Sequence, residues 1–77
     1  MAEKSLDNPN WRPLEELVGP SGCAQFMWMW REAEIEFYKH IVTRRYLLLD
    51  AAGRCYRREA SGFQLVEVWI ELERVTK

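Results

Sequence analysis

The sequence predicts an α+β fold, a four- to five-stranded antiparallel meander with a short helix at its N-terminal end and another helix at its C-terminal end. Short apolar or alternating runs separated by turn residues are typical of sequential strands that pair with their neighbours. Helix-start signals precede these runs, and a segment with a helical apolar stripe follows them. A sheet curled toward a small barrel is the alternative arrangement of the same strands.

The N-terminal part of the chain predicts a tail and then a short helix. Residues 1–10 are polar and carry no periodic apolar pattern, so we expect a mobile tail there and a single small domain over 11–77. Asn10 can cap a helix in which Pro13 occupies the first turn, where a missing N–H costs little. The Gly-Pro pair at 19–20 is expected to end this helix.

Residues 25–31 form an apolar run whose aromatic content favours a strand over a buried helix. On a regular strand, alternate side chains point to opposite faces, so three aromatic residues would share one face and two methionines the other. The three aromatic residues are Phe26, Trp28 and Trp30. The turn over 31–34 contains no Gly, Asn or Pro.

Residues 35–41 and 45–58 supply the middle of the predicted sheet. In 35–41, Ile35 and Phe37 share one face, and Tyr38 and His40 the other. In 45–58, Asp50 at the first turn position can bond the backbone ahead of it, and Gly53 supplies positive φ. The predicted pairs of this hairpin are Asp50 with Arg54, Leu49 with Cys55, and Leu48 with Tyr56.

The C-terminal segment 63–77 fits both a strand and a helix. Alternating apolar residues favour a strand at its start, and a helical stripe opposite acidic and basic residues favours a helix later. We therefore predict a short strand to about Glu67, followed by a helix from Val68 to about Thr76.

Composition limits the classes of function. The formal net charge is −1, whereas general nucleic-acid binders are strongly basic. No apolar run has the length of a membrane span, and the polar start lacks a signal-peptide pattern, so we expect a cytoplasmic protein without membrane contact. With two cysteines and one histidine, a four-ligand zinc site cannot form in one copy. We expect no metal and no cofactor.

One set of basic and aromatic residues could bind a ligand. Arginine forks suit phosphate, and tyrosines beside arginines on a sheet can stack nucleic-acid bases. Salt-bridged, solvated strand faces are the alternative explanation for the same residues. The candidate binding residues are Lys39, His40, Arg44, Arg45, Tyr46, Tyr56, Arg57 and Arg58.

The aromatic run at 26–30 is the second candidate surface. Phe26, Trp28 and Trp30 are either core residues or an interface, because so short a chain has little interior for its aromatic residues. No phosphate-cradling glycine loop, nucleophile motif or paired acid and base is present, so we predict no catalytic residues and no enzyme. The predicted function is a protein-interaction or self-associating module, with a protein partner or a homodimer. The alternative is binding of nucleic acid or a phosphate ligand through the Arg/Tyr face.

Overall fold

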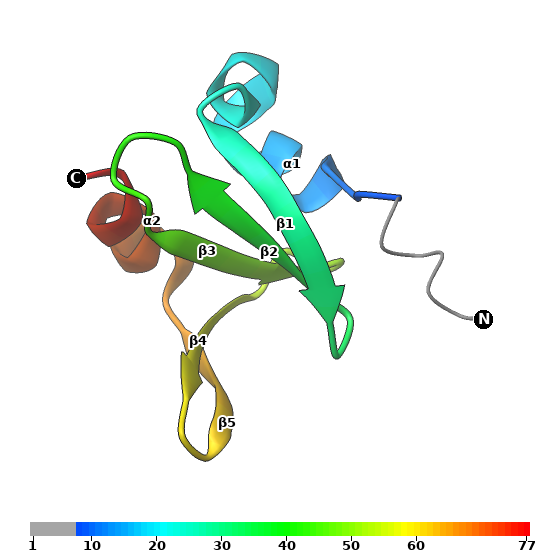
Figure 1. The fold of residues 1–77 in the computed structure, drawn as a ribbon, viewed down its shortest axis with the longest axis vertical. Coiled ribbons are helices and arrows are strands. Elements are labelled where there is room, and N and C mark those ends of the chain that lie inside the picture. Colours follow the sequence, from blue (N-terminus) through cyan, green and yellow to red (C-terminus); the bar gives the residue numbers. More distant parts are fainter. Residues whose placement is uncertain (1–7) are drawn as a thin grey trace.

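The computed structural model describes residues 8–77, and within them the chain forms two helices and a five-stranded sheet. The predicted α+β fold is confirmed. Most of the predicted tail over 1–10 lies outside the described residues. In chain order, the elements in Figure 1 are α1 (Arg12–Cys23), β1 (Phe26–Glu32), β2 (Ile35–His40), β3 (Tyr46–Asp50), β4 (Cys55–Glu59), β5 (Gly62–Val66) and α2 (Val68–Thr76).

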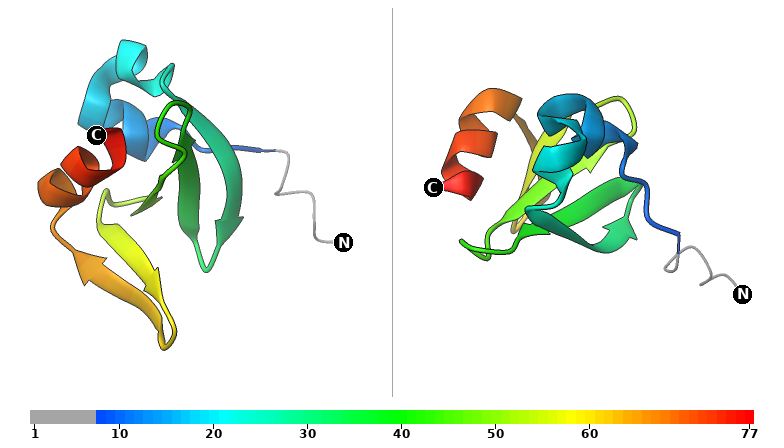
Figure 2. Two further views of the ribbon diagram at one scale, coloured as in Figure 1. Left: turned by 60° about the vertical axis from the view of Figure 1, so that its left-hand side comes forward. Right: turned by 90° about the horizontal axis from the view of Figure 1, so that it is seen from above.

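The sheet is a simple antiparallel meander with strand order β1-β2-β3-β4-β5. Over residues 8–77 it stays open, with β1 and β5 at its edges, so the barrel alternative is not realised. Both helices lie on the same side of the sheet, as Figure 2 shows. There α1 contacts β1 and β3, and α2 contacts β3 and β4. Neither described helix is long and apolar enough to cross a membrane.

The β3–β4 hairpin forms as its sequence predicts. Leu48 lies opposite Tyr56 and Leu49 opposite Cys55, and the N–H of Asp50 donates to the carbonyl oxygen of Arg54 at 3.0 Å. The Oδ1 atom of Asp50 accepts the backbone N–H groups of Ala52 at 3.0 Å and Arg54 at 2.9 Å. Gly53 has φ +86°. A local carboxylate and one glycine therefore determine this turn.

The expected face pattern of β1 is wrong because the strand contains a bulge at Met29. Trp28 lies opposite Tyr38, but Trp30 lies opposite Phe37, so β1 has one residue more than β2 between these pairs. Phe37 and Tyr38 point to opposite faces, and so do the tryptophans paired with them. Phe26 stays on the same face as Trp28, and Trp30 is on the other.

The turn between β1 and β2 has strained geometry. Ala33 and Glu34 connect the pair Glu32–Ile35 with φ values of +53° and +64°. Positive φ at both positions of a two-residue loop defines a type I′ turn, which asparagine and glycine normally occupy. Two side chains with a Cβ are thus held in the left-handed region, at a cost of about 1 kcal/mol or more each.

Helix α1 extends beyond the predicted stop. Gly19 does break the helical path, with φ +80° and ψ +166°, but Pro20 begins another helical turn that runs to Cys23. Proline suits the first position of a helix, which explains why the chain can resume after the break. At the start, the N-cap is Trp11 and not the predicted Asn10, although Oδ1 of Asn10 accepts the backbone N–H of Arg12 at 3.2 Å. The expected early proline is Pro13, which is buried.

The predicted change from strand to helix near Glu67 is confirmed. Glu67 is the N-cap of α2, and its Oε1 atom accepts the backbone N–H groups of Trp69 at 3.1 Å and Ile70 at 3.3 Å. These bonds use two N–H groups that have no acceptor within the helix. A carboxylate at this end also interacts favourably with the helix dipole.

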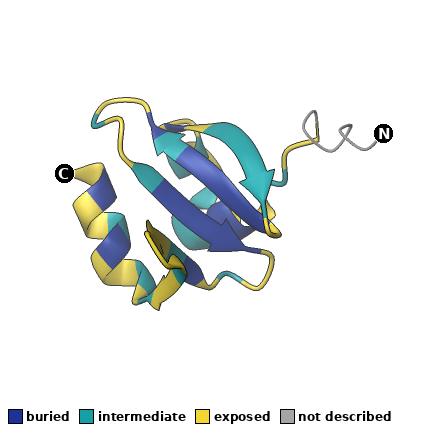
Figure 3. Cartoon of the chain, turned by 60° about the horizontal axis from the view of Figure 1, so that its bottom comes forward, coloured by how far each residue is buried: buried dark blue, intermediate teal, exposed yellow. Residues whose placement is uncertain are grey.

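The core has two parts, one on each face of the sheet, and β2 and β3 are buried between them (Figure 3). We call the side covered by the helices the helix face. Its buried residues are Leu14, Phe26, Tyr38, Leu47, Leu49, Cys55 and Val75. We call the other side the open face. Its members are the buried Ile35, Phe37 and Leu48 with the half-buried Met29, Trp30, Tyr46, Tyr56 and Phe63.

Candidate anion-binding groove

A groove opens where β3 and β4 separate, and residues from both faces of the sheet line it. The described register between these strands consists of the two residue pairs nearest the turn, and beyond them the β4–β5 hairpin turns away from β3 (Figure 1). From the helix side, Glu71 and Arg74 of α2 reach the same groove. Its volume is about 430 Å³, which falls in the range of small-ligand sites.

The apolar part of the groove is aromatic. Trp30 stacks on Phe37 with ring centroids 4.7 Å apart and an angle of 21° between the planes. The ring centroids of Tyr46 and Trp30 lie 5.8 Å apart, and Tyr56 and Leu48 complete the apolar lining. Phe37 and Leu48 are buried, whereas Trp30 and the two tyrosines are half-buried. The half-buried rings therefore leave aromatic surface that a ligand can contact.

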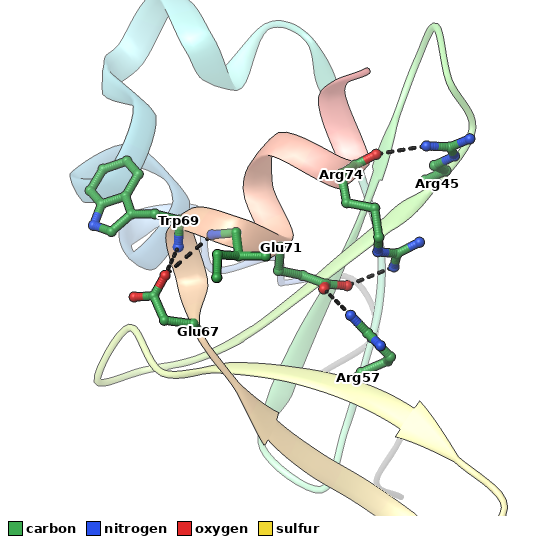
Figure 4. Close-up of polar contacts among 7 residues, drawn as sticks. Arg45, Arg57, Glu67, Trp69, Glu71 and Arg74 are labelled. Atoms are coloured by element: carbon green, nitrogen blue, oxygen red, sulfur yellow. Dashed lines mark hydrogen bonds and ion pairs between the residues drawn. The ribbon is translucent and has the colours of Figure 1, made fainter.

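Two arginines bind one carboxylate of α2, and a third arginine binds the backbone of the same helix. The Nη2 atoms of Arg57 and Arg74 donate to the two carboxylate oxygens of Glu71 at 2.8 and 2.6 Å, and Nη1 of Arg45 donates to the carbonyl oxygen of Arg74 at 2.8 Å. Figure 4 shows Arg57 of β4 and Arg74 of α2 pointing to the Glu71 carboxylate, and Arg45, which directly precedes β3, bonded to the backbone of Arg74. We call Arg45, Arg57 and Arg74 with Glu71 the arginine cluster.

Glu71 is ionised although only 2% of it is exposed. Burial raises the pKa of this carboxyl, but hydrogen bonds and charge from Arg74 and Arg57 lower it by more, so the net pKa lies below its usual value. The side chains of Arg57 and Arg74 are each 46% exposed. A guanidinium carries more N–H donors than these contacts use, so the cluster can still donate to an anion.

A second ion pair crosses the open face. Nη2 and Nη1 of Arg58 on β4 donate to the two carboxylate oxygens of Glu32 on β1, at 2.6 and 3.2 Å. Since β2 and β3 lie between these strands, the pair spans the face, and the guanidinium lies 5.8 Å from the Phe37 ring centroid. We call it the Arg58–Glu32 bridge. It neutralises Arg58 and covers part of the aromatic surface.

Tyr56 is held in place by Asp50. Its hydroxyl donates to Oδ2 of Asp50 at 2.8 Å, and the Nε of Arg54 donates to the same oxygen at 2.9 Å. Burial raises the pKa of Asp50, but the hydrogen bonds from the Arg54 N–H, the Tyr56 hydroxyl and the Arg54 guanidinium lower it below its usual value. The tyrosine ring therefore has a defined position at the wall of the groove.

The structure brings most of the predicted binding residues together. The members that line the groove are Arg45, Tyr46, Tyr56, Arg57 and Arg58. Lys39 lies beside them, with its Nζ 5.7 Å from the Tyr46 ring centroid. Arg44 is exposed in the β2–β3 loop with φ +68° and does not line the groove. Of the three candidate interface residues, Trp30 is in the groove, while Phe26 and Trp28 pack on the helix face.

His40 is on the other side of the sheet from the groove. It is 4% exposed, its ring meets Phe26 edge-on at 5.0 Å, and its Nδ1 accepts the backbone N–H groups of Val42 at 3.3 Å and Thr43 at 3.2 Å. These bonds give the one histidine of the chain a role in holding the β2–β3 loop. The groove thus contains no imidazole.

Sequence reasoning did not assign Glu71, Arg74 and Phe37 to this site, and it placed Leu48 beside the tyrosines without naming it as a binding residue. Phe37 and Leu48 carry a signal in the sequence, because they alternate with the residues of the helix face. For Glu71 and Arg74 no local signal exists, since their helical spacing is equally typical of an ordinary solvated ion pair. Their part in the groove depends on how α2 packs behind β4.

Other chemistry is sparse in the part of the chain that the structure describes. Over residues 8–77, no group of three or more His, Cys, Asp or Glu side chains is placed to hold a metal ion. Cys23 and Cys55 are both free thiols. Burial is the main cause that raises the pKa of Cys55 to about 12, which makes its thiolate rare at neutral pH.

The geometry of the groove is the basis for assigning a function. Compared with family models, with curated proteins and with solved structures, the chain shows no match.

Proposed function

We propose that this protein is a non-catalytic binding module whose groove takes single-stranded nucleic acid. The observation that carries the proposal is that half-buried aromatic rings of the open face and three arginines beside α2 line one groove, at the gap between β3 and β4. Single-strand binders combine aromatic platforms, on which bases stack, with cations that contact the phosphates. The aromatic run at 26–30 gives less support to the protein-interface hypothesis, because Phe26 is buried in the helix-face core.

The charge of the groove supports the same proposal despite the acidic balance of the whole chain. The lining contains four arginines and one glutamate, and Glu32 beside it neutralises Arg58, which leaves a net charge of +2, against −1 for the complete sequence. Positive charge is therefore concentrated at the aromatic surface. A low total charge predicts weak general attraction to nucleic acid, so binding should depend on this groove.

Fluorescence anisotropy with labelled single-stranded RNA and DNA, at low and moderate salt, tests the proposal. We expect salt-sensitive micromolar binding, weakened about tenfold by Tyr46→Leu, which keeps an apolar side chain but removes the stacking ring. The matched control is Arg44→Gln, because Arg44 is exposed outside the groove lining. Absence of binding at low salt, or an unchanged affinity of the Tyr46→Leu variant, would contradict the proposal.

A second candidate function is association with a protein partner or a second copy. It is favoured by three large apolar residues at the junction of β5 and α2, where Leu65 is 60%, Trp69 60% and Ile70 67% exposed. Exposed apolar residues close together in the chain can belong to an interaction surface. Sedimentation equilibrium over a wide concentration range tests self-association, and the double change Trp69→Ser and Ile70→Ser should abolish any dimer. If the protein is a monomer at all concentrations, the homodimer hypothesis is wrong.

We also propose a cytoplasmic location, which two thiols free of a disulfide support. Imaging of the tagged full chain, with a leader-bearing version as control, tests this location.

A further inference from the structure

We propose that the arginine cluster recognises a terminal phosphomonoester, the phosphate at the end of a strand or of a free nucleotide, rather than the phosphodiesters along a strand. This inference rests on the proposed function and assigns the part of the ligand that each side of the groove would contact. Its observations are the hydrogen bonds that hold the cluster on α2, the neutralised Arg58 on the other side and the size of the groove.

The net charge of the cluster matches a phosphomonoester. Arg45, Arg57 and Arg74 carry three positive charges against the one negative charge of Glu71, so the cluster has a net charge of +2. A phosphomonoester carries a charge of about −1.5 to −2 at neutral pH, and its terminal oxygens can accept bonds from several guanidinium groups at once. A phosphodiester has a single negative charge and presents fewer oxygens.

Glu71 pre-orients two of the three arginines in the cluster. It holds Arg57 and Arg74 by one Nη2 atom each, and Arg45 is attached to α2 through the carbonyl oxygen of Arg74. All three arginine side chains are thus held against α2 before a ligand arrives, which lowers the entropic cost of ordering them. The remaining donors of these guanidinium groups are the ones available to the phosphate.

The cations do not continue along the open face. Beyond the aromatic rings, Arg58 is already paired with Glu32 through two hydrogen bonds. Lys39, near the Tyr46 ring, is the other cation in reach. Proteins that hold the middle of a strand spread their cations along the backbone path. Here the positive charge is at one side, and the Arg58–Glu32 bridge crosses the face on the other.

The volume of the groove fits the same arrangement. At about 430 Å³ it lies toward the lower end of the ~300–1,000 Å³ range of small-ligand sites. A single base that lies between Tyr56 on one side and Trp30 with Tyr46 on the other would fill much of the groove. Its phosphate would then lie at the arginine cluster. A longer strand would have to leave the groove from the sugar of this terminal nucleotide.

Isothermal titration of the full chain with short oligouridylates tests the inference. The probes carry a 5′-phosphate, a 3′-phosphate or hydroxyls at both ends, and uridine monophosphate and inorganic phosphate are titrated separately. We expect one of the two phosphorylated probes, with its phosphate at either the 5′ or the 3′ end, to have an affinity about tenfold higher than the probe with hydroxyls at both ends. This preference should decrease as the pH falls from about 7.5 to 5, because the second pKa of a phosphomonoester is about 6.

Variants separate the cluster from general electrostatics. Arg45 is exposed and contacts a backbone oxygen, so Arg45→Gln should leave the fold intact and remove most of the preference for the phosphorylated end. Arg44→Gln removes the same charge from the neighbouring residue and should retain the preference. If both variants lose it equally, the cluster is not the phosphate site.

The remaining outcomes distinguish this inference from the proposed function. Equal affinity for phosphorylated and hydroxyl oligonucleotides overturns the inference and leaves single-strand binding intact. If uridine monophosphate binds as tightly as the phosphorylated oligonucleotide, terminal-phosphate recognition is supported and the free nucleotide is the source. If inorganic phosphate binds but none of the nucleotides or oligonucleotides does, the inference is overturned. If no probe binds at all, both proposals are contradicted.

Discussion

Trp30 of β1 stacks on Phe37 of β2, on the opposite face of the sheet from Trp28, although only one residue separates the two tryptophans. The cause is the extra residue Met29, which changes the alternation of side chains along β1. The bulge therefore divides the aromatic residues of one strand between the helix-face core and the groove.

Deletion of Met29 should be far more damaging than its truncation. Without the extra residue, the side chains on one side of the deletion must turn to the wrong face: either Trp30, or both Phe26 and Trp28. We therefore expect a loss of at least about 3 kcal/mol in the free energy of unfolding. Met29→Ala keeps the register and should cost less than about 2 kcal/mol. Urea denaturation followed by tryptophan fluorescence measures both. Similar losses for the two variants would show that the register does not depend on this residue.

Replacement of the strained β1–β2 turn should stabilise the protein. Ala33→Asn combined with Glu34→Gly puts the preferred type I′ residues where φ is +53° and +64°. Both side chains are exposed, so little packing is lost, and we expect a gain of about 1 kcal/mol or more in unfolding free energy. Thermal denaturation checks it. The control, Ala51→Asn with Ala52→Gly, changes a turn without positive φ at those residues and should give no gain.

Gly19→Ala should destabilise the domain. The φ and ψ angles of Gly19, +80° and +166°, lie in a region that is open almost only to glycine. A Cβ there would meet no atom within 4 Å, so the expected loss of about 1–3 kcal/mol comes from the backbone and not from a clash. Chemical denaturation measures the loss, with the exposed Ser21→Ala as control. Unchanged stability would mean that the break between the two helical turns can relax.

Acid should destabilise the protein through Asp50 and Glu71. Both folded-state pKa values lie below the unfolded values of about 3.8 and 4.5. For a lowered carboxyl pKa, the stabilisation is fully present above the unfolded pKa and is lost as the pH falls through the folded pKa. Unfolding free energy, measured by urea denaturation, should therefore be constant near neutral pH and fall below about pH 4.5.

Glu71→Gln should reduce the slope of this acid loss, since one of the two carboxylates no longer titrates. The matched control is Glu73→Gln on the same helix, where the pair with Lys77 is exposed and contributes little. If Glu73→Gln changes the pH dependence as much as Glu71→Gln, the buried pairs with Arg57 and Arg74 are not the cause.

The sequence determined the features whose interactions are local. The β3–β4 turn follows from Asp50 bonding its own loop and from the positive φ of Gly53, and the start of α2 follows from the capping carboxylate of Glu67. In each case the residues that interact lie within four positions of one another, so residue types and spacing suffice to predict the structure. The alternation of faces along β2 and β3 was predictable for the same reason.

The tertiary structure decided how the residues of the candidate site are assembled. The bulge at Met29 shifts the register between β1 and β2, and the register of β3 with β4 is short where α2 contacts both strands. The contact between Arg57 and Glu71 joins residues from a strand and a helix, and the Arg58–Glu32 bridge joins the first strand to the fourth. Such contacts arise from the competition of many distant residues for the same buried space, and no short pattern in the sequence records its outcome.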